Sequence, residues 1–358
     1  MNALTTIKKY KQRVKNVSVI AGILLISLLI LGWASKDDSV KHTRTIYAMD
    51  TQMDFTVYES EKADSLTKVN QEINHLEKLL STTDQQSEIY AINHEAKPIP
   101  VSSETAEVLQ LALNLAKQTD GVFDPTIYPL IYKWGFTTGD YHVLSDEEIK
   151  HTLPLVDYRK VNLAGDIVSL PQGMEIDLGA IGKGYTGDKI IELLKHEGIC
   201  SALINLGGNV QALGTKPDGL PWKIGLKSPD SNDNLAVLEI ADKAVITSGG
   251  YERYFQDEQG NTYWHILDPK TGKPAHSGLI SATVIGKQGA ICDALSTTFF
   301  IMGKDKAIDF WRKNYSKDID MILITDNNEI YLTENMVKSF TLEPKYANYP
   351  IYVVKANA

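Results

Sequence analysis

The sequence predicts an α+β fold, a single compact unit of catalytic size behind an N-terminal membrane anchor. Segments with strand periodicity and segments with helical periodicity mix without the regular strand–helix–strand rhythm of a parallel sheet. No linker rich in proline, glycine or serine divides residues 45–358. With 358 residues, of which 43% are hydrophobic, the chain can bury one large core or two modest ones.

The first 34 residues predict a membrane anchor or a signal sequence. Residues 1–16 form a basic segment without acidic side chains, and residues 17–34 are an uncharged apolar run. This run lies at the short end of a membrane span and at the long end of a signal sequence. Because the preceding lysines should stay in the cytoplasm, we expect the rest of the chain on the extracytoplasmic side of the cell membrane. Gly32 and Ala34 would fit a cleavage site, but we favour an uncleaved anchor, followed by a polar tether over residues 35–45.

Residues 46–358 are expected to form the catalytic-size domain. Alternation of apolar and polar residues predicts a strand at residues 51–57. Further strands are predicted at residues 203–206, 222–226, 235–240, 263–266, 280–284 and 321–324. Helical periodicity predicts helices, at residues 66–80, from Ser102 or Ser103 to just before Gly121, at 189–195 and at 289–302.

Charge and cysteine content exclude two classes of protein. After residue 34 the chain carries 31 basic and 45 acidic residues, a formal charge of −14. Such an acidic body argues against nucleic acid as a partner, because phosphate backbones require a basic surface. Only Cys200 and Cys292 occur, so a disulfide-stapled scaffold is excluded, although one disulfide is possible.

The segment 176–185 is the most informative part of the chain. It holds Asp177, Lys183 and three glycines directly ahead of the helix predicted for residues 189–195. Glycines let the backbone approach a ligand, and the amides at a helix start favour anions, so the segment suits a phosphorylated ligand. It is not a Walker A loop, because Gly184 stands where a Ser or Thr would hold magnesium. An ordinary glycine-rich turn explains the pattern equally well.

The helix predicted for residues 289–302 brings three oxygen-bearing side chains to one face. Asp293, Ser296 and Thr297 are spaced three and four residues apart. Hard oxygen ligands of this kind suit Mg²⁺ or Ca²⁺ and do not suit zinc. An ordinary polar stripe on a half-buried helix is the alternative.

Four weaker motifs remain ambiguous on their own. His265 follows a predicted strand, where it could act as a general base or position a phosphate, but the chain has eight histidines. The other three motifs are explained equally well by turns and by backbone that approaches a ligand. They are Phe123–Thr126, Asn205–Asn209 and Thr247–Tyr251.

The order of these motifs along the chain resembles the ApbE family of FAD:protein FMN transferases, over about residues 45–340. The motifs that carry the resemblance are Met49–Thr51, Leu80–Thr82 with Ser87–Ile89, Phe123–Thr126, Asp177–Tyr185, Asn205–Asn209, Thr247–Gly249, His265–Gly272 and Asp293–Thr297. The resemblance implies a T-fold-like catalytic domain, FAD as substrate and a required Mg²⁺. It also implies that a Thr or Ser hydroxyl of an exported acceptor protein attacks the FMN phosphorus, so that AMP leaves and FMN stays attached through a phosphoester.

The resemblance also assigns roles to individual residues. Mg²⁺ would be held by Asp293 and Thr297, by the backbone carbonyl of Ala180 and by Ser296, where some relatives have a second aspartate. His265 would assist or position the attacking hydroxyl, with Asp293 as its rival for that role. Contacts to FAD are implied for Met49, Thr83, Val122, Phe123, Asp124, Asp177, Lys183 and Leu267.

Three functions are compatible with these residues. The leading one is a membrane-tethered flavin transferase. A metal-dependent FAD pyrophosphatase would use the same site with water as the acceptor. A non-catalytic FAD-binding protein would not need the full set of Lys183, His265, Asp293 and Thr297. The acceptor protein and the oligomeric state cannot be derived from the sequence.

Overall fold

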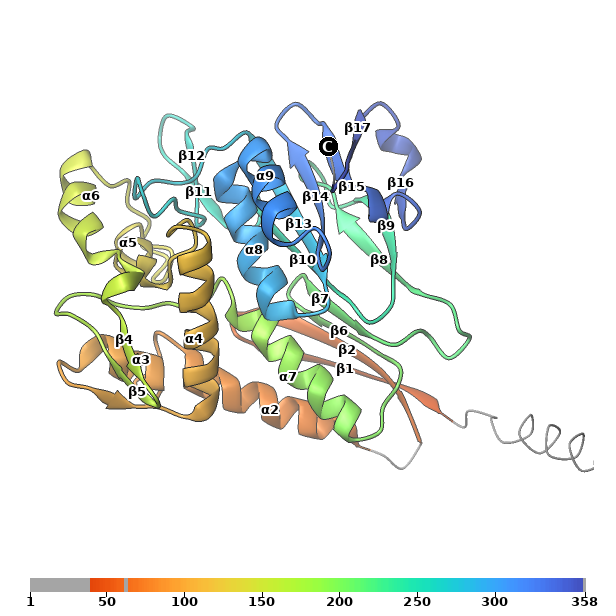
Figure 1. Cartoon of the computed structure of the whole chain (residues 1–358), viewed down its shortest axis with the longest axis horizontal. Coiled ribbons are helices and arrows are strands. Elements are labelled where there is room, and N and C mark those ends of the chain that lie inside the picture. The colour runs from red at the N-terminus through yellow and green to blue at the C-terminus, as the bar shows by residue number, and fades with distance from the viewer. Residues whose placement is uncertain (1–38, 61–63, 357–358) are drawn as a thin grey trace, which may run out of the picture. The chain divides into compact units, whose positions relative to one another are not determined.

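The structure is a computed structural model that describes residues 39–60 and 64–356. The predicted basic segment and the apolar run at 17–34 lie outside the described residues. In the described part of the chain, no helix is both long enough and apolar enough to cross a membrane. From Lys41 onward, the described residues form one compact unit (Figure 1).

A nine-stranded sheet is the centre of this unit, in the order β1-β2-β6-β7-β10-β13-β14-β15-β17 (Figure 1). The pairs from β2 to β15 run antiparallel, and β15 and β17 run parallel. The strands are β1 (Val40–Ala48), β2 (Thr51–Glu59), β6 (Ala202–Leu206), β7 (Asn209–Leu213), β10 (Ala244–Gly249), β13 (Leu279–Gly286), β14 (Asp320–Thr325), β15 (Ile330–Thr333) and β17 (Ile351–Val354).

The tether predicted for residues 35–45 is wrong from Val40 on, because β1 begins there. The side chains of β1 alternate between exposed and half-buried along the strand, and β1 lies next to β2 at the edge of the sheet. Its inward-facing positions include His42 and Arg44. These polar residues hide the period-two pattern that identifies a strand.

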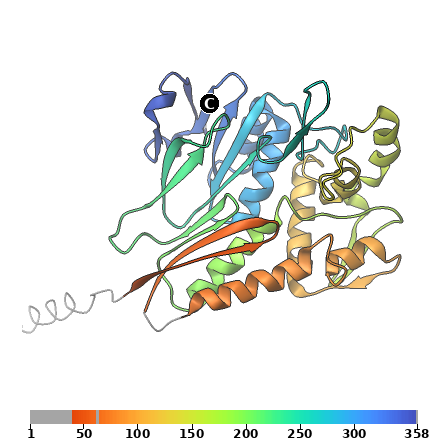
Figure 2. The same cartoon turned by 180° about the vertical axis from the view of Figure 1, so that it is seen from behind.

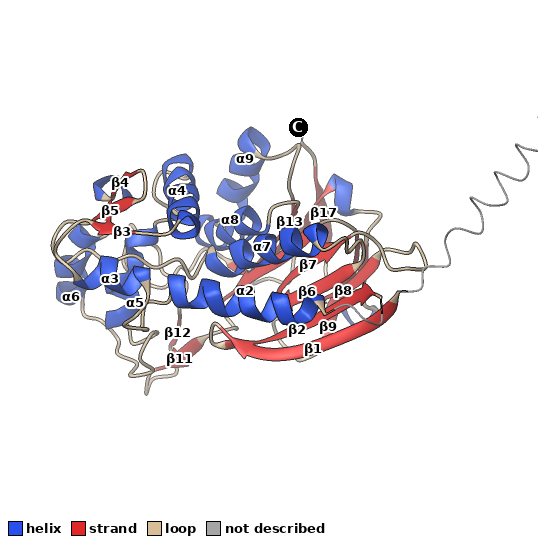
Figure 3. Cartoon of the chain, turned by 90° about the horizontal axis from the view of Figure 1, so that it is seen from below, coloured by secondary structure: helices blue, strands red, loops and turns tan. Residues whose placement is uncertain are grey.

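Helices cover one face of the large sheet (Figure 3). Three of them, α2 (Ser65–Leu80), α7 (Gly182–His196) and α8 (Gly289–Met302), lie side by side there, and α9 (Lys304–Asn314) follows α8. Helix α8 is almost completely buried, with Leu295 and Phe299 in the main core. The helix that carries the predicted metal ligands is therefore fixed by packing.

A three-stranded sheet packs on the other face, seen from behind in Figure 2. Its strands are β8 (Trp222–Lys227), β9 (Asn234–Ile240) and β16 (Phe340–Leu342). Apolar side chains of β8 and β9 form a second core with Ile322 and Ile324 of β14. Antiparallel sheets with helices on one face are typical of the α+β class, so the predicted class is confirmed.

Most of the remaining elements form a largely helical lobe beside the sheet, with two small sheets, β3-β5-β4 and β11-β12, and short 3₁₀ helices. The helices are α3 (Glu88–His94), α4 (Ser103–Gln118), α5 (Tyr128–Lys133) and α6 (Asp146–Thr152). The strands are β3 (Ile99–Pro100), β4 (Asn162–Ala164), β5 (Ile167–Ser169), β11 (Tyr254–Gln256) and β12 (Thr262–Trp264). The 3₁₀ helices of this lobe are η1 (Pro125–Ile127), η2 (Leu153–Leu155) and η3 (Tyr158–Lys160). Two further 3₁₀ helices, η4 (Glu334–Met336) and η5 (Pro344–Tyr346), contribute Met336 and Tyr346 to the second core.

Helix α7 begins seven residues earlier than the predicted 189–195, inside the glycine-rich segment. Glycine is a poor helix former, so the helical periodicity of the first turns of α7 is hard to recognise in the sequence. Close packing explains the glycine at position 184: a Cβ added to it would lie 2.3 Å from the Gly289 carbonyl oxygen and 2.7 Å from the Asp293 Cβ. Helices α7 and α8 therefore cross with almost no side chain between them at this point.

This close approach makes Gly184→Ala strongly destabilising. We expect it to lower the free energy of unfolding by about 1–3 kcal/mol, because helix α8 must move away. Urea unfolding of the purified protein measures the change. Gly182→Ala in the same helix is the matched control, since a Cβ there would meet nothing within 4 Å and alanine favours a helix. Equal losses in the two variants would contradict the packing argument.

Candidate active site

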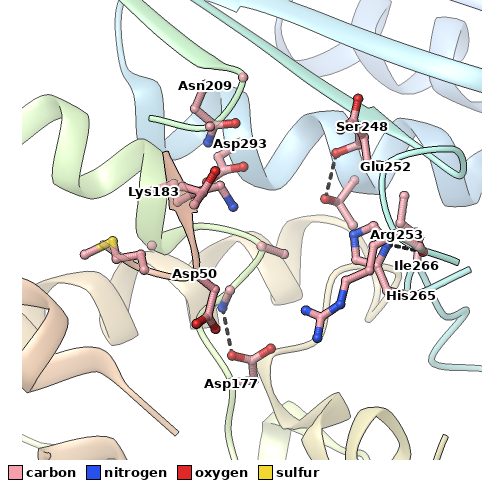
Figure 4. Close-up of a pocket in the computed structure, with 18 of the residues that line it drawn as sticks. Asp50, Asp177, Lys183, Asn209, Ser248, Glu252, Arg253, His265, Ile266 and Asp293 are labelled. Atoms are coloured by element: carbon pink, nitrogen blue, oxygen red, sulfur yellow. Dashed lines mark hydrogen bonds between the residues drawn. The ribbon is translucent and has the colours of Figure 1, made fainter. Parts of the chain in front are cut away.

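One cavity of about 960 Å³ collects most of the predicted site residues. It is lined from one side by the β1–β2 turn, the start of α7 and the strand ends of the large sheet. From the other side it is lined by loops of the helical lobe. Figure 4 shows the side chains from these segments around an open centre. The volume is within the range of sites that bind small molecules and cofactors.

Asp293 forms the polar floor of this cavity. It extends from α8, is only 5% exposed, and its Oδ2 accepts a hydrogen bond of 2.9 Å from the backbone N–H of Gly184. Lys183 lies beside it (Figure 4). Desolvation raises the pKa of Asp293, against the opposing effects of the Lys183 charge and the Gly184 N–H. A buried carboxylate whose charged form is disfavoured in this way gains from a bound cation.

The other predicted metal ligands divide into two groups. Thr297 and Ala180 line the cavity with Asp293, and no hydrogen bond reaches the Ala180 carbonyl oxygen from any residue that the structure describes. Ser296 is fully buried and does not line the cavity. Its Oγ donates to the Asp293 backbone carbonyl at 2.8 Å and lies 2.7 Å from the Ser248 Oγ.

These donors fit a hard cation. A carboxylate, a hydroxyl and a free backbone carbonyl facing one cavity are oxygen ligands of the type that Mg²⁺ accepts. Across residues 39–60 and 64–356, no three His, Cys, Asp or Glu side chains gather into a metal-binding group. The fit therefore depends on Asp293 as the only carboxylate, with Thr297 and Ala180 beside it.

Asp177 and Lys183 lie at opposite ends of the glycine-rich turn, and both face the cavity. Asp177 Oδ1 accepts the N–H of Gly179 at 2.9 Å, and desolvation raises its pKa while the charges of Lys183 and Arg253 lower it. Among the described residues, no carboxylate lies within 4.0 Å of the Lys183 ammonium. Its charge is thus available to a ligand phosphate.

His265 lies across the cavity from these groups (Figure 4). Its Nδ1 is 3.1 Å from the backbone carbonyl of Arg253, so Nδ1 carries the proton as the donor and Nε2 keeps a lone pair. Although the ring borders the cavity and is only half-buried, surrounding protein desolvates it and lowers the pKa of His265 to about 4. The nearby charges of Arg253 and Lys183 contribute to this lowering, and the hydrogen bond to the Arg253 carbonyl opposes it. At neutral pH the ring is uncharged and can accept a proton.

The residues predicted to contact FAD all line the cavity, although not all of them offer a side chain to it. Met49 and Asp50 have φ values of 48° and 58° in the tight β1–β2 turn, and the Met49 N–H is bound to Glu77 at 2.6 Å. Thr83 is exposed, and its hydroxyl lies 3.3 Å from Ser81 Oγ. The remaining ones come from neighbouring loops, at Val122, Phe123, Asp124 and Leu267.

The carboxylate of Asp124 is occupied by the loop that it organises. It accepts the Thr126 N–H at 2.9 Å, the Thr126 hydroxyl at 2.6 Å and the Tyr158 N–H at 3.0 Å. Burial raises the pKa of Asp124 in spite of these bonds. The Asp124 side chain therefore stabilises a turn, as one of the two explanations of this motif proposes. A ligand in the cavity could be contacted here only by backbone groups.

The cavity also contains polar side chains that were not among the predicted site residues: Asp50, Asn209, Ser248, Glu252 and Arg253. Asn209 is 4% exposed, and its Nδ2 has no hydrogen-bond partner among the described residues. The glycines of the segment 205–209 indicate only that its backbone could approach a ligand or form a tight bend, and they do not indicate a role for the Asn209 side chain. Nothing in the local pattern around Arg253 indicates a binding residue.

Comparisons with known proteins agree on one family. The model of the ApbE family matches residues 49–323. A protein of Klebsiella pneumoniae named FAD:protein FMN transferase is 36% identical over 274 residues, which cover 75% of this chain and 84% of that protein. A protein of Treponema pallidum with the same name is 34% identical over 257 residues, covering 66% of this chain and 71% of its own length.

Solved structures show the same similarity in three dimensions. The crystal structure of the ApbE protein from Thermotoga maritima superimposes with a TM-score of 0.78 at 32% identity, covering 84% of this chain and 99% of that one. The crystal structure of the apo form of the flavinyl transferase ApbE from Pseudomonas stutzeri superimposes with a TM-score of 0.72 at 28% sequence identity. The match covers 80% of this chain and 92% of that one. With the family model spanning most of the chain, the chain belongs to the ApbE family.

Proposed function

We propose that this protein transfers the FMN part of FAD to a Thr or Ser hydroxyl of an exported acceptor protein, in a reaction that requires Mg²⁺ and releases AMP. One observation carries the proposal. A single cavity holds a buried carboxylate that favours a cation, an uncharged histidine and a lysine that has no carboxylate partner in the part of the chain that the structure describes. Membership of the ApbE family and the names of the relatives support an enzyme that transfers flavin.

The chain's own groups divide the work of such a reaction. Lys183 attracts the phosphates, and the Asp177 turn holds the backbone of the loop in place. Asp293, Thr297 and the Ala180 carbonyl would hold Mg²⁺, which supplies neutralisation of phosphate charge when bound. The neutral Nε2 of His265 would take the proton of the acceptor hydroxyl.

The proposed reaction is a single displacement at the FMN phosphorus and needs no covalent enzyme intermediate. The acceptor oxygen forms a bond to the FMN phosphorus, and the bond from that phosphorus to the bridging oxygen of AMP breaks. The electron pair leaves with AMP, and the hydroxyl proton passes to His265. Positioning and charge neutralisation are the main contributions that a protein makes to phosphoryl transfer.

Incubation with an acceptor tests the proposal. The full-length chain in mild detergent is mixed with FAD, Mg²⁺ and an exported candidate acceptor, the acceptor is weighed by intact-mass spectrometry, and AMP is quantified. An acceptor heavier by one FMN, with an equal amount of AMP, supports the transferase. AMP with free FMN and unmodified candidates identifies a pyrophosphatase, and FAD binding without AMP identifies a binding protein.

We also propose that residues 17–34 anchor the chain in the cell membrane, with the catalytic domain on the extracytoplasmic side. The basic segment ahead of the apolar run supports this orientation. Protease added to intact spheroplasts should digest the domain, whereas a domain inside the membrane barrier would be protected until lysis.

Lys183→Ala is expected to weaken FAD binding about 10- to 100-fold, because a charge-assisted hydrogen bond to phosphate contributes about 1.5–3 kcal/mol. Titration of FAD fluorescence measures the dissociation constant. Lys189→Ala is the control in the same helix, since Lys189 pairs with Glu107 at 2.7 Å and does not line the cavity. Unchanged affinity in the Lys183 variant would show that this lysine does not contact FAD.

A further inference from the structure

Asp188 binds the start of helix α8 from a neighbouring helix. It belongs to α7, and its two carboxylate oxygens accept the backbone N–H groups of Gly289 at 2.6 Å and Ala290 at 2.9 Å. These are the first two residues of α8, and the residue before them, Gln288, makes no side-chain cap. The first N–H groups of a helix lack partners within the helix, so Asp188 satisfies two of them.

A buried glutamine of the large sheet lies where helices α7 and α8 meet. Gln211 of β7 is 3% exposed, and its Nε2 donates to the Gly184 carbonyl at 3.0 Å. A Cβ on Gly187 would lie 2.2 Å from this Nε2, and a Cβ on Gly289 would lie 1.8 Å from it. The glycines of both helices thus leave space for one amide, around which β7, α7 and α8 meet.

This junction lies directly behind the predicted metal ligand. Asp293 follows Gly289 and Ala290 by about one helical turn and accepts the N–H of Gly184 at 2.9 Å. Helix α7 therefore holds α8 twice, through Asp188 at the end of the helix and through Gly184 at Asp293. A shift of the first turn of α8 along α7 would move the Asp293 carboxylate within the cavity.

We propose that Asp188 is a positioning residue, which together with Gln211 fixes the N-terminal turn of α8 and thereby places the Asp293 carboxylate for metal binding. The inference rests on the proposed function for the presence of the metal. Desolvation raises the pKa of Asp188 to about 6, so at pH 7.5 the carboxylate form, with both oxygens as acceptors, still predominates. Groups that orient a metal ligand without touching the metal typically change affinity 10- to 100-fold.

The test measures Mn²⁺ binding to the full-length chain at pH 7.5 by electron paramagnetic resonance, with no flavin present. Asp188→Asn keeps the shape but leaves an amide NH₂ facing a backbone N–H. Asp320→Asn is the matched control. Asp320 is also a buried carboxylate, 4% exposed, but it accepts bonds from Lys243, Thr333 and Asn335 instead of from α7 or α8.

We expect Asp188→Asn to raise the Mn²⁺ dissociation constant roughly tenfold, with Asp320→Asn within about twofold of the parent. Hydrogen exchange of a peptide that contains Gly184 should become faster in the Asp188 variant only, because the N–H bond to Asp293 loosens. The proposal is contradicted if the Asp188 variant keeps its Mn²⁺ affinity and its exchange rate at Gly184, and loses only as much melting temperature as the control. Asp188 would then stabilise the end of α8 without positioning Asp293. A parent that binds no Mn²⁺ would overturn the inference as well, while the acceptor assay reports on the transferase independently.

Discussion

Asp293→Asn is expected to lower flavin transfer by roughly a hundredfold or more, because it removes the only carboxylate among the three proposed Mg²⁺ ligands, which are Asp293, Thr297 and the Ala180 carbonyl. The fold should survive. The asparagine Oδ1 can still accept the Gly184 N–H that now binds Asp293 at 2.9 Å. AMP release under saturating FAD and Mg²⁺ measures the loss, and retained activity would contradict the assignment of Asp293 as a metal ligand.

The thermal stability of the Asp293→Asn variant relative to the parent gives a second test, and the direction of the change can be predicted. Burial raises the folded-state pKa of Asp293 above its ordinary value. Above the folded pKa the carboxylate is charged in both states, and folding bears the cost of desolvating it. The destabilisation disappears as the pH falls below the ordinary value. Without metal at neutral pH, Asp293→Asn should therefore melt at the same temperature as the parent or higher.

Added Mg²⁺ should reverse that order. A cation that binds the folded parent stabilises it in proportion to RT ln(1 + [L]/Kd), whereas the asparagine variant gains little. Thermal unfolding with and without Mg²⁺ measures both effects without any turnover. A variant that gains as much as the parent from Mg²⁺ would place the metal elsewhere.

Strands and helices could be predicted from the sequence wherever one face of the element is buried and the opposite face is exposed to solvent. Helix α2 is an example, with Leu66, Val69, Ile73 and Leu76 buried at helical spacing, and its prediction as residues 66–80 is confirmed to within one residue. The start of α7 was not accessible, because Gly184 and Gly187 in its first two turns are explained by contact with Gly289 and Gln211, far along the chain. Helix α9 was missed.

The candidate site shows the same division. The order of the motifs along the chain indicated a family resemblance, and the structure brings residues from most of these motifs into one cavity. Helical spacing placed Ser296 on one face with Asp293 and Thr297, yet Ser296 is fully buried and does not line the cavity, although Ser248 of β10 lies within hydrogen-bond distance of the hydroxyls of both Ser296 and Thr297. Spacing within one helix cannot show which side of that face a neighbouring strand covers. Asp188 was overlooked for a related reason, since its partner Gly289 is 101 residues away.

His265→Asn is expected to slow the chemical step about 10²- to 10⁴-fold while leaving FAD affinity within about twofold. The asparagine amide can replace Nδ1–H as donor to the Arg253 carbonyl, now 3.1 Å from Nδ1, but it has no atom at the position of Nε2. Single-turnover rates and FAD titration separate the two effects. His276→Gln is the control, because His276 is exposed and lies outside the cavity. A loss of affinity alone would exclude the role as a base.

The pH dependence then distinguishes a desolvated base from an ordinary histidine. With its pKa near 4 in the folded protein, His265 stays neutral across the range where an exposed imidazole would gain a proton. His265 should therefore cause no decline in kcat/KM of the free enzyme near pH 6.5, and the decline expected near pH 6 comes from protonation of Asp188, whose pKa is about 6. The same depressed pKa costs stability as the pH falls from about 6.5 towards 4, because only the unfolded chain takes up the proton there. His265→Asn should reduce this acid sensitivity, so that one substitution removes the catalytic base and part of the instability that its burial produces.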